Sequence, residues 1–149
     1  MKDKVNEITI SYRNDENPKR WHKITDSKDA AKLLFENWNK DTIALKECFK
    51  IMLLNNDNKV KGIYEISQGS ISSTLVDLRI LFAVILKSLT VAIILAHNHP
   101  SGKLKASESD KEVTKKIKQA AALFDVKVLD HIIVTPQLEY YSFADNGLL

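Results

Sequence analysis

The sequence predicts one domain of the α/β or α+β class, with a single mixed sheet flanked by helices. Apolar runs of strand length alternate with segments whose apolar residues recur every three or four positions, which is the helical period. The segment Val91–Ala96 is apolar throughout, as is typical of a strand covered on both faces. The 149 residues suit one compact core, and no repeat or low-complexity linker divides them. We expect residues 1–40 to form an extension and residues 41–149 to form the core.

The extension is predicted to carry one strand and one helix. Apolar and polar residues alternate over Ile8–Tyr12, which indicates a half-buried strand. A helix follows over Ser27–Asn37, where the apolar residues have helical spacing. Asp26 or Ser27 can cap this helix, because a short side-chain oxygen accepts a hydrogen bond from the free amides of the first turn.

The core is predicted to open with a hairpin. Cys48–Leu54 and Val60–Ser67 are apolar runs, and the Asn and Asp residues between them tolerate the positive φ that a tight turn needs. Helical spacing then occurs twice, on either side of the central strand. The remaining expected elements are helices over Asp77–Ser88 and Glu108–Phe124, and strands over Val126–Val134 and Tyr140–Phe143.

The charge pattern gives no strong sign of a nucleic-acid partner. The net charge is +3, from 22 basic and 19 acidic residues. The densest basic patch is Lys111–Lys118, where no aromatic residue interleaves to stack on bases. Such a pattern is more typical of a solvated helix face than of a nucleic-acid groove. Nucleic-acid binding is therefore permitted by the composition but not indicated by it.

The sequence points to a cytoplasmic protein without a membrane partner. Its longest apolar run is far below the roughly 18 residues of a membrane span, and Met1–Val5 is not followed by the apolar block of an export signal. Cys48 is the only cysteine, which excludes an intramolecular disulfide and a zinc site built mainly from thiolates. We expect Cys48 to be a buried thiol.

The candidate functional residues follow the central strand. His97 and His99 are two positions apart, so both rings project to the same side if the strand continues. Asp110 opens the next predicted helix, from which its carboxylate can turn back toward the strand end. Two imidazoles and one carboxylate are a ligand set that Zn²⁺ accepts, with a fourth tetrahedral position left for water. A catalytic zinc site needs such an open position.

A histidine pair on a strand is also often structural or solvent-facing, so the pair alone does not establish a metal site. The longer pattern is more specific: His-x-His, seven intervening residues, serine, two residues and aspartate. It resembles the JAMM motif of the MPN-domain metalloproteases. The wider sequence, over about residues 41–149, resembles the RadC family of bacterial JAMM-domain proteins. The segments that carry this resemblance are Ile94–Gly102, Val128–His131, Tyr141–Asp145, Gly62–Ser67 and Leu75–Arg79, although Leu78 stands where a proline is common.

The resemblance implies a fold, a cofactor and a set of ligands. The fold is of the MPN/JAMM type, a cytidine-deaminase-like mixed sheet flanked by helices. The cofactor is Zn²⁺, held by His97, His99 and Asp110. Ser107 would support the ligands or stabilise an oxyanion, and a backbone amide in the Ser101–Gly102 turn is the alternative oxyanion donor.

The resemblance also implies an upstream glutamate that takes a proton from the zinc-activated water. Glu65 is the candidate, because it falls in a matching segment; an exposed carboxylate on an edge strand is the competing interpretation. Glu47, at the start of a strand, is the weaker alternative. His131 follows Asp130 in a predicted strand, and a structural role is favoured there over one as partner to a ligand.

The implied activity is metal-assisted hydrolysis of a peptide or isopeptide bond, with a peptide or protein as substrate. Two other functions stay open. One is a DNA-associated accessory role, because the RadC family carries a historical DNA-repair label, and the other is a metal-binding scaffold that does not hydrolyse its partner. Bound zinc that is lost on His97→Ala would support hydrolysis. Salt-dependent binding to DNA would support the DNA-associated role, and zinc retention without hydrolysis would support the scaffold.

Overall fold

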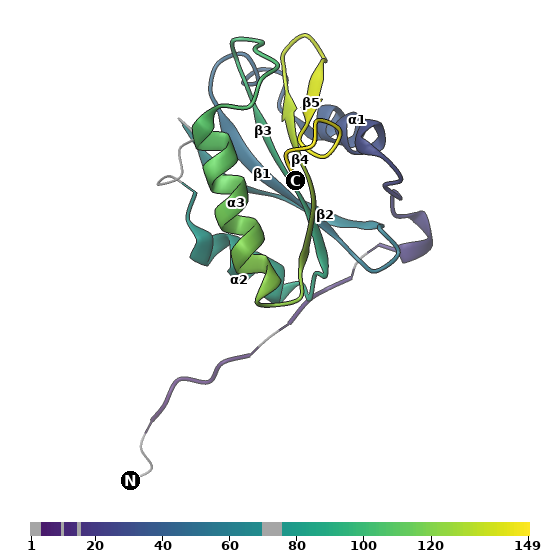
Figure 1. The fold of residues 1–149 in the computed structure, drawn as a ribbon. Helices are drawn as coiled ribbons and strands as arrows, with labels where there is room; N and C mark the ends of the chain where they lie inside the picture. The colour runs from purple at the N-terminus through teal and green to yellow at the C-terminus, as the bar shows by residue number, and fades with distance from the viewer. Residues whose placement is uncertain (1–3, 10, 15, 70–75) are drawn as a thin grey trace.

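The structure, a computed structural model, describes residues 4–9, 11–14, 16–69 and 76–149 (Figure 1). Its elements in chain order are a short 3-10 helix η1 (Pro18–Arg20), α1 (Ser27–Asn37), β1 (Cys48–Leu54), β2 (Val60–Gln68), α2 (Leu78–Lys87), β3 (Ala92–Asn98), α3 (Glu108–Ala122), β4 (Lys127–Val134) and β5 (Tyr140–Ser142). The strands form one sheet of order β2-β1-β3-β4-β5. β3 runs parallel to β4, and the other neighbouring strands are antiparallel. The predicted mixed sheet is confirmed.

Each predicted helix and core strand is present, and the bounds agree to within two residues at either end. Asp26, rather than Ser27, caps α1: its Oδ1 accepts a hydrogen bond of 2.8 Å from the Asp29 amide. In the segment Leu75–Arg79, Leu75 lies outside the described residues and Leu78 begins α2. No α-helix among the described residues has the length and apolar character needed to span a bilayer.

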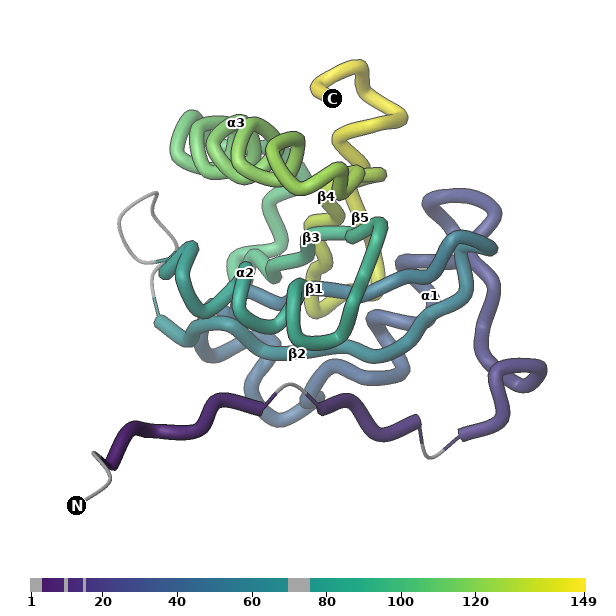
Figure 2. The backbone as a smooth tube through the Cα atoms, turned by 90° about the horizontal axis from the view of Figure 1, so that it is seen from below, coloured from purple at the N-terminus to yellow at the C-terminus, as the bar shows by residue number. Residues whose placement is uncertain are grey.

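The sheet is covered on both faces, which explains the continuous burial of β3 (Figures 1 and 2). Alternate residues of each strand point to opposite faces. On one face Met52 and Ile94 pack with apolar residues of α1. On the other face Ile51 and Leu95 pack with residues of α2 and α3. We call these the α1 face and the α3 face.

The helix α1 belongs to the packed structure although it lies within the first forty residues. Ala30 and Leu34 are fully buried and contribute to the core on the α1 face. The isolated bridge between Lys23 and Lys59 joins the chain just before α1 to the start of β2.

The strand expected over Ile8–Tyr12 is not formed by the described residues of that segment, and Ile10 lies outside them. Val5 and Ile8 are 87% and 90% exposed, and Figure 1 shows this part of the chain leading away from the sheet. Alternation of apolar residues makes a strand only where a neighbouring strand offers its free backbone groups. The prediction of a strand here, which rested on the alternation alone, was therefore wrong for the described residues.

Candidate metal centre

The topology explains why Asp110 returns to the two histidines. β3 and β4 are parallel neighbours, and α3 connects them. The chain must leave one end of the sheet and re-enter at the other, so the crossover helix begins near the end of the strand before it. The first turn of α3, which carries Asp110, thus lies beside the end of β3, which carries His97 and His99.

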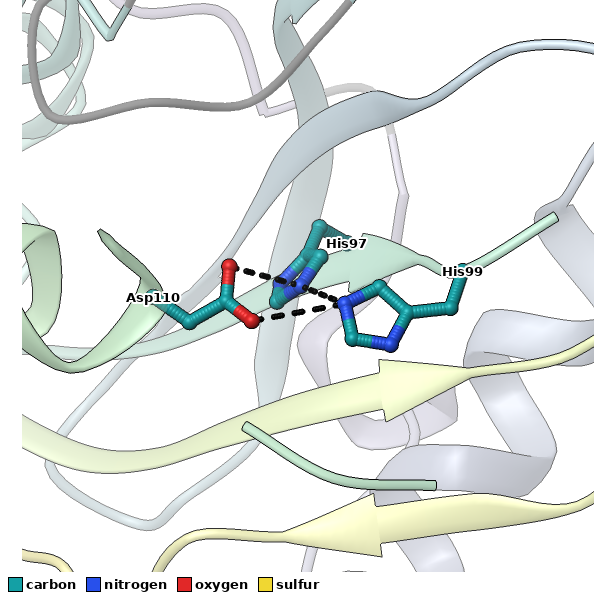
Figure 3. Close-up of side chains that lie close together, drawn as sticks. All are labelled: His97, His99 and Asp110. Carbon is teal, nitrogen blue, oxygen red and sulfur yellow. Dashed lines mark hydrogen bonds and ion pairs between the residues drawn. The ribbon is translucent and has the colours of Figure 1, made fainter. Parts of the chain in front are cut away.

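The three predicted ligands point toward one another (Figure 3). His97 Nε2 lies 3.2 Å from Asp110 Oδ1, and His99 Nε2 lies 3.3 Å from Asp110 Oδ2. The two Nε2 atoms are 2.9 Å apart. The side chains of His97 and Asp110 are 0% and 3% exposed, whereas that of His99 is 12% exposed. The group is therefore buried, with His99 as its most accessible member.

The second ring nitrogen of each histidine is engaged by the protein. His99 Nδ1 lies 2.7 Å from the Lys103 carbonyl oxygen, so Nδ1 carries a proton and donates it there. His97 Nδ1 lies 2.7 Å from His131 Nε2. Both rings consequently direct Nε2 at Asp110, and a metal ion binds an imidazole through a nitrogen that carries no proton.

The electrostatics of this group suit a bound cation. Burial lowers the pKa of His97, and the bond to Asp110 offsets only part of this effect. Burial also opposes charge on His99, but Asp110 and the Lys103 carbonyl raise the pKa of His99 above its ordinary value. Burial would raise the pKa of Asp110, yet the close approach of the two histidine rings holds it well below its usual range. The carboxylate is thus ionised at neutral pH.

The donor set fits zinc in number and spacing. With bonds of about 2.0–2.1 Å, two ligand atoms of a tetrahedral site lie about 3.3 Å apart, and the three separations here are 2.9 to 3.3 Å. Nitrogen lone pairs that face each other at this distance repel unless a cation or a proton lies between them. Two imidazoles and one carboxylate leave the fourth position open. A divalent cation would therefore be held by His97, His99 and Asp110.

Ser107 positions Asp110 through a capping box at the start of α3. The Asp110 amide donates to Ser107 Oγ at 3.1 Å, and the Ser107 amide donates to Asp110 Oδ2 at 2.8 Å. The serine side chain satisfies an otherwise free helix amide, while its backbone fixes the orientation of the carboxylate. In the bond to the Asp110 amide the Ser107 hydroxyl is the acceptor, so its own proton can be donated to another group.

Replacing Ser107 by alanine is expected to lower the free energy of unfolding by about 1 kcal/mol, the usual effect of losing an N-cap. Affinity for a divalent cation should fall only as far as the first turn of α3 loosens, because Ser107→Ala keeps the backbone amide that donates to the Asp110 carboxylate. Urea denaturation and metal titration measure the two effects. Ser109→Ala is the control, because Ser109 lies two residues further on, in the first turn of α3, and is not part of the capping box. Equal stability of the two variants would contradict the assignment.

One amide of the Ser101–Gly102 turn, the alternative oxyanion donor, already donates a hydrogen bond within the loop. The Gly102 amide donates to the His99 carbonyl at 3.0 Å, and Gly102 has a φ of 83°. A Cβ at this position would lie 2.7 Å from Gln137 Oε1, so both the backbone conformation and the close contact favour glycine. The Ser101–Gly102 turn shapes the loop between the ligands.

The structure does not bring Glu65 to the metal group. Its register partner on β1 is Lys50, which in turn pairs with Ala96. Paired residues share a face of the sheet, so Glu65 belongs to the α1 face, whereas His97, paired with Phe49, belongs to the α3 face. Glu65 is exposed and accepts a hydrogen bond of 2.6 Å from Gln68. Its role as a base stays a prediction that the register does not favour.

Glu47 is better placed than Glu65. It lies two residues before Phe49 and so continues the α3 face of β1. Phe49 pairs with His97 in the antiparallel register, and an extension of this pairing by two residues beyond the strand ends would bring Glu47 opposite His99. Glu47 is half-buried, and its charge is a minor influence that favours a higher pKa for both His97 and His99, although burial still lowers the pKa of His97. The pocket beside it is also lined by Pro100 and Ser101.

Sequence reasoning did not single out Asn98, which stands between the two histidines. Its side chain points away from them and is fully buried. The Cys48 amide donates to its Oδ1 at 2.7 Å, and its Nδ2 donates to the carbonyls of Ile43 and Lys46 at 2.7 and 2.9 Å. Asn98 thereby ties β3 to the loop that leads to Glu47. The feature of the sequence that could have pointed to this role is a polar residue at the end of an otherwise apolar, fully buried strand.

The fold and the site together define a mixed α/β domain with a possible three-ligand metal centre at a strand end. The RadC-like JAB domain family matches residues 24–148. The chain belongs to this family, which agrees with the resemblance in the histidine loop. The matched region begins before α1, and so includes that helix.

Several relatives share the same region. A UPF0758 protein of Flavobacterium johnsoniae is 44% identical over 126 residues, which are 85% of this chain and 53% of the relative. A UPF0758 protein of Alkaliphilus metalliredigens is 38% identical over 128 residues, 86% of this chain and 53% of the relative. One of Porphyromonas gingivalis is 40% identical over 99 residues, 66% of this chain and 44% of the relative. The chain thus spans about half the length of these relatives.

Proposed function

We propose that this chain is a zinc-dependent hydrolase of peptide or isopeptide bonds. The observation that carries the proposal is the buried group of His97, His99 and Asp110, whose three ligand atoms lie close enough to hold one ion. Three protein ligands would leave the fourth tetrahedral position to water. Bound zinc supplies Lewis acidity, which polarises a carbonyl and makes water reactive near neutral pH. Membership of the RadC-like JAB domain family supports the same chemistry.

The residues of the chain would divide the remaining tasks. Glu47 is the proposed base: its carboxylate takes a proton from the attacking water and passes it to the leaving amine. Its half-buried position beside a pocket that is also lined by Pro100 and Ser101, the residues that follow His99, supports this role. The Ser107 hydroxyl, which is exposed beside Asp110, donates to the developing oxyanion.

The comparison of Glu47→Gln with Glu65→Gln tests the assignment of the base. Removing a general base typically lowers kcat by about 10²- to 10⁴-fold. We expect Glu47→Gln to show this loss and Glu65→Gln to stay within about threefold of the wild type. The assay uses zinc-loaded protein with fluorescence-quenched peptides and with peptides joined through a lysine ε-amine.

Zinc content is measured on the same samples, because the comparison requires that Glu47→Gln and Glu65→Gln bind as much zinc as the wild type. A loss confined to Glu65→Gln would return the role to Glu65. Wild-type protein that retains zinc but cleaves neither class of substrate would favour the scaffold function over hydrolysis.

A further inference from the structure

His131 is a fully buried histidine on β4 that the proposed chemistry does not use directly. It pairs in the parallel register with Leu95, so it shares the α3 face with His97. Its ring stacks on Phe143 at a centroid distance of 4.5 Å and meets the edge of Phe49 at 5.7 Å. These two rings hold the plane of the imidazole, and therefore the direction of both of its nitrogens.

Both nitrogens of His131 have a close partner. Nε2 lies 2.7 Å from His97 Nδ1, and Nδ1 lies 2.6 Å from Thr114 Oγ1. The Thr114 hydroxyl also lies 2.7 Å from the Asp110 carbonyl oxygen, to which it donates. A continuous hydrogen-bonded chain thus runs from the ring of one metal ligand to the backbone of another.

The directions of these bonds follow from the donor inventory. A carbonyl oxygen only accepts, so the single proton of Thr114 points to Asp110. The hydroxyl must then accept from His131 Nδ1–H, which leaves the Nε2 of a neutral His131 as an acceptor. His97 donates to that acceptor through Nδ1–H, and its own Nε2 is left without a proton, facing His99 and Asp110.

We propose that Thr114 and His131 are positioning residues that hold His97 as the Nδ1–H tautomer and so present its Nε2 to the metal ion. This inference rests on the proposed metal site, but it concerns the arrangement of protons in the protein before metal arrives. Without the Thr114 hydroxyl, His131 Nδ1–H has no acceptor. His131 then favours the other tautomer, and its Nε2–H would drive the proton of His97 onto Nε2.

Thr114→Val removes the hydroxyl at nearly constant volume and is the variant that tests the proposal. Loss of a residue that orients a metal ligand typically lowers metal affinity by 10- to 100-fold, and we expect a loss of about that size for Thr114→Val. Thr114→Ser restores the hydroxyl and should recover the wild-type affinity. The affinity is measured for Zn²⁺ alone, by competition with a chelating dye.

Thr90→Val is the matched control. Thr90 is also a buried threonine whose hydroxyl is hydrogen-bonded, to Ser88 at 2.8 Å, but it precedes β3 at the end far from the ligands. Its replacement should leave zinc affinity unchanged. If Thr114→Val does not fold, Thr114→Ala carries the same expectation.

The second readout is the ¹⁵N NMR spectrum of the histidine rings in metal-free protein, which distinguishes the two tautomers without any enzymatic assay. We expect His97 to be protonated at Nδ1 in the wild type and in Thr114→Ser, and at Nε2 in Thr114→Val. Equal zinc affinity in wild type and Thr114→Val, or an Nε2–H ring in the wild type, would overturn the proposal. A wild type that binds no zinc refutes the metal site itself, while the spectra still decide the tautomer.

Discussion

Zinc is expected to raise the melting temperature of the wild-type chain and to leave that of Asp110→Asn almost unchanged. A ligand that binds only the folded state at a hundredfold excess over its Kd stabilises it by about 2.7 kcal/mol. For a domain of this size that corresponds to a shift of about 5 to 10 °C. Asp110→Asn removes the one anionic ligand but keeps an oxygen that can accept from the Ser107 amide. Bound zinc should fall from about one equivalent in the wild type to a small fraction of that in the variant.

Asp41→Asn is the control for this experiment, because it changes the charge by the same amount at an exposed position of the loop before β1. Thermal unfolding with and without Zn²⁺, together with elemental analysis of dialysed protein, gives the result. A melting temperature that rises equally in Asp110→Asn would place the metal elsewhere. Adding a chelator to the zinc-loaded wild type should return its melting temperature to the metal-free value. A chelator should not change the melting temperature of metal-free Asp110→Asn or Asp41→Asn.

Replacing Asn98 by alanine is expected to lower the free energy of unfolding by about 3 to 4 kcal/mol. The change leaves the Cys48 amide and the carbonyls of Ile43 and Lys46 without their side-chain partner in a fully buried place. Each buried polar group left unpaired costs about 1–3 kcal/mol, and water that enters the vacated volume recovers a part of this. The loop before β1 should loosen, so the hydrolysis that we propose for Glu47 should fall too.

Asn56→Ala is the matched control, since Asn56 is exposed in the turn between β1 and β2. It is expected to change the free energy of unfolding by less than about 0.5 kcal/mol. Urea denaturation followed by circular dichroism measures both variants. If Asn98→Ala proves as stable as Asn56→Ala, the three hydrogen bonds do not carry the stability that we assign to them.

The local elements of this fold could be predicted because their causes are local. The caps of α1 and α3 are short polar side chains at the first turn, and the periodicity of the apolar residues gave the length of each helix. The candidate metal ligands could also be predicted from the sequence. His97 and His99 are close in the chain, and the return of Asp110 follows from the crossover that joins two parallel strands.

The choice between Glu65 and Glu47 was beyond the sequence. In the pairing of β1 with β2, Phe49 lies opposite Ser67 and Lys50 lies opposite Glu65, so the register shifts by one residue between these pairs. If the register of the pair Phe49 and Ser67 continued without this bulge, Glu65 would pair with Ile51. Glu65 would then share the α3 face with His97. A shift of one residue moves a side chain to the opposite face of the sheet.

The sequence by itself determined the order of helices and strands, the buried central strand and the three candidate ligands, because each depends on residues near one another in the chain. The tertiary structure placed Glu65 on the face of the sheet opposite to His97, and it revealed the hydrogen-bonded chain from Thr114 through His131 to His97. It also left Ile8 exposed, because a strand needs a partner. These outcomes depend on strand register and on contacts between distant segments, which the pattern of residues along one segment does not contain.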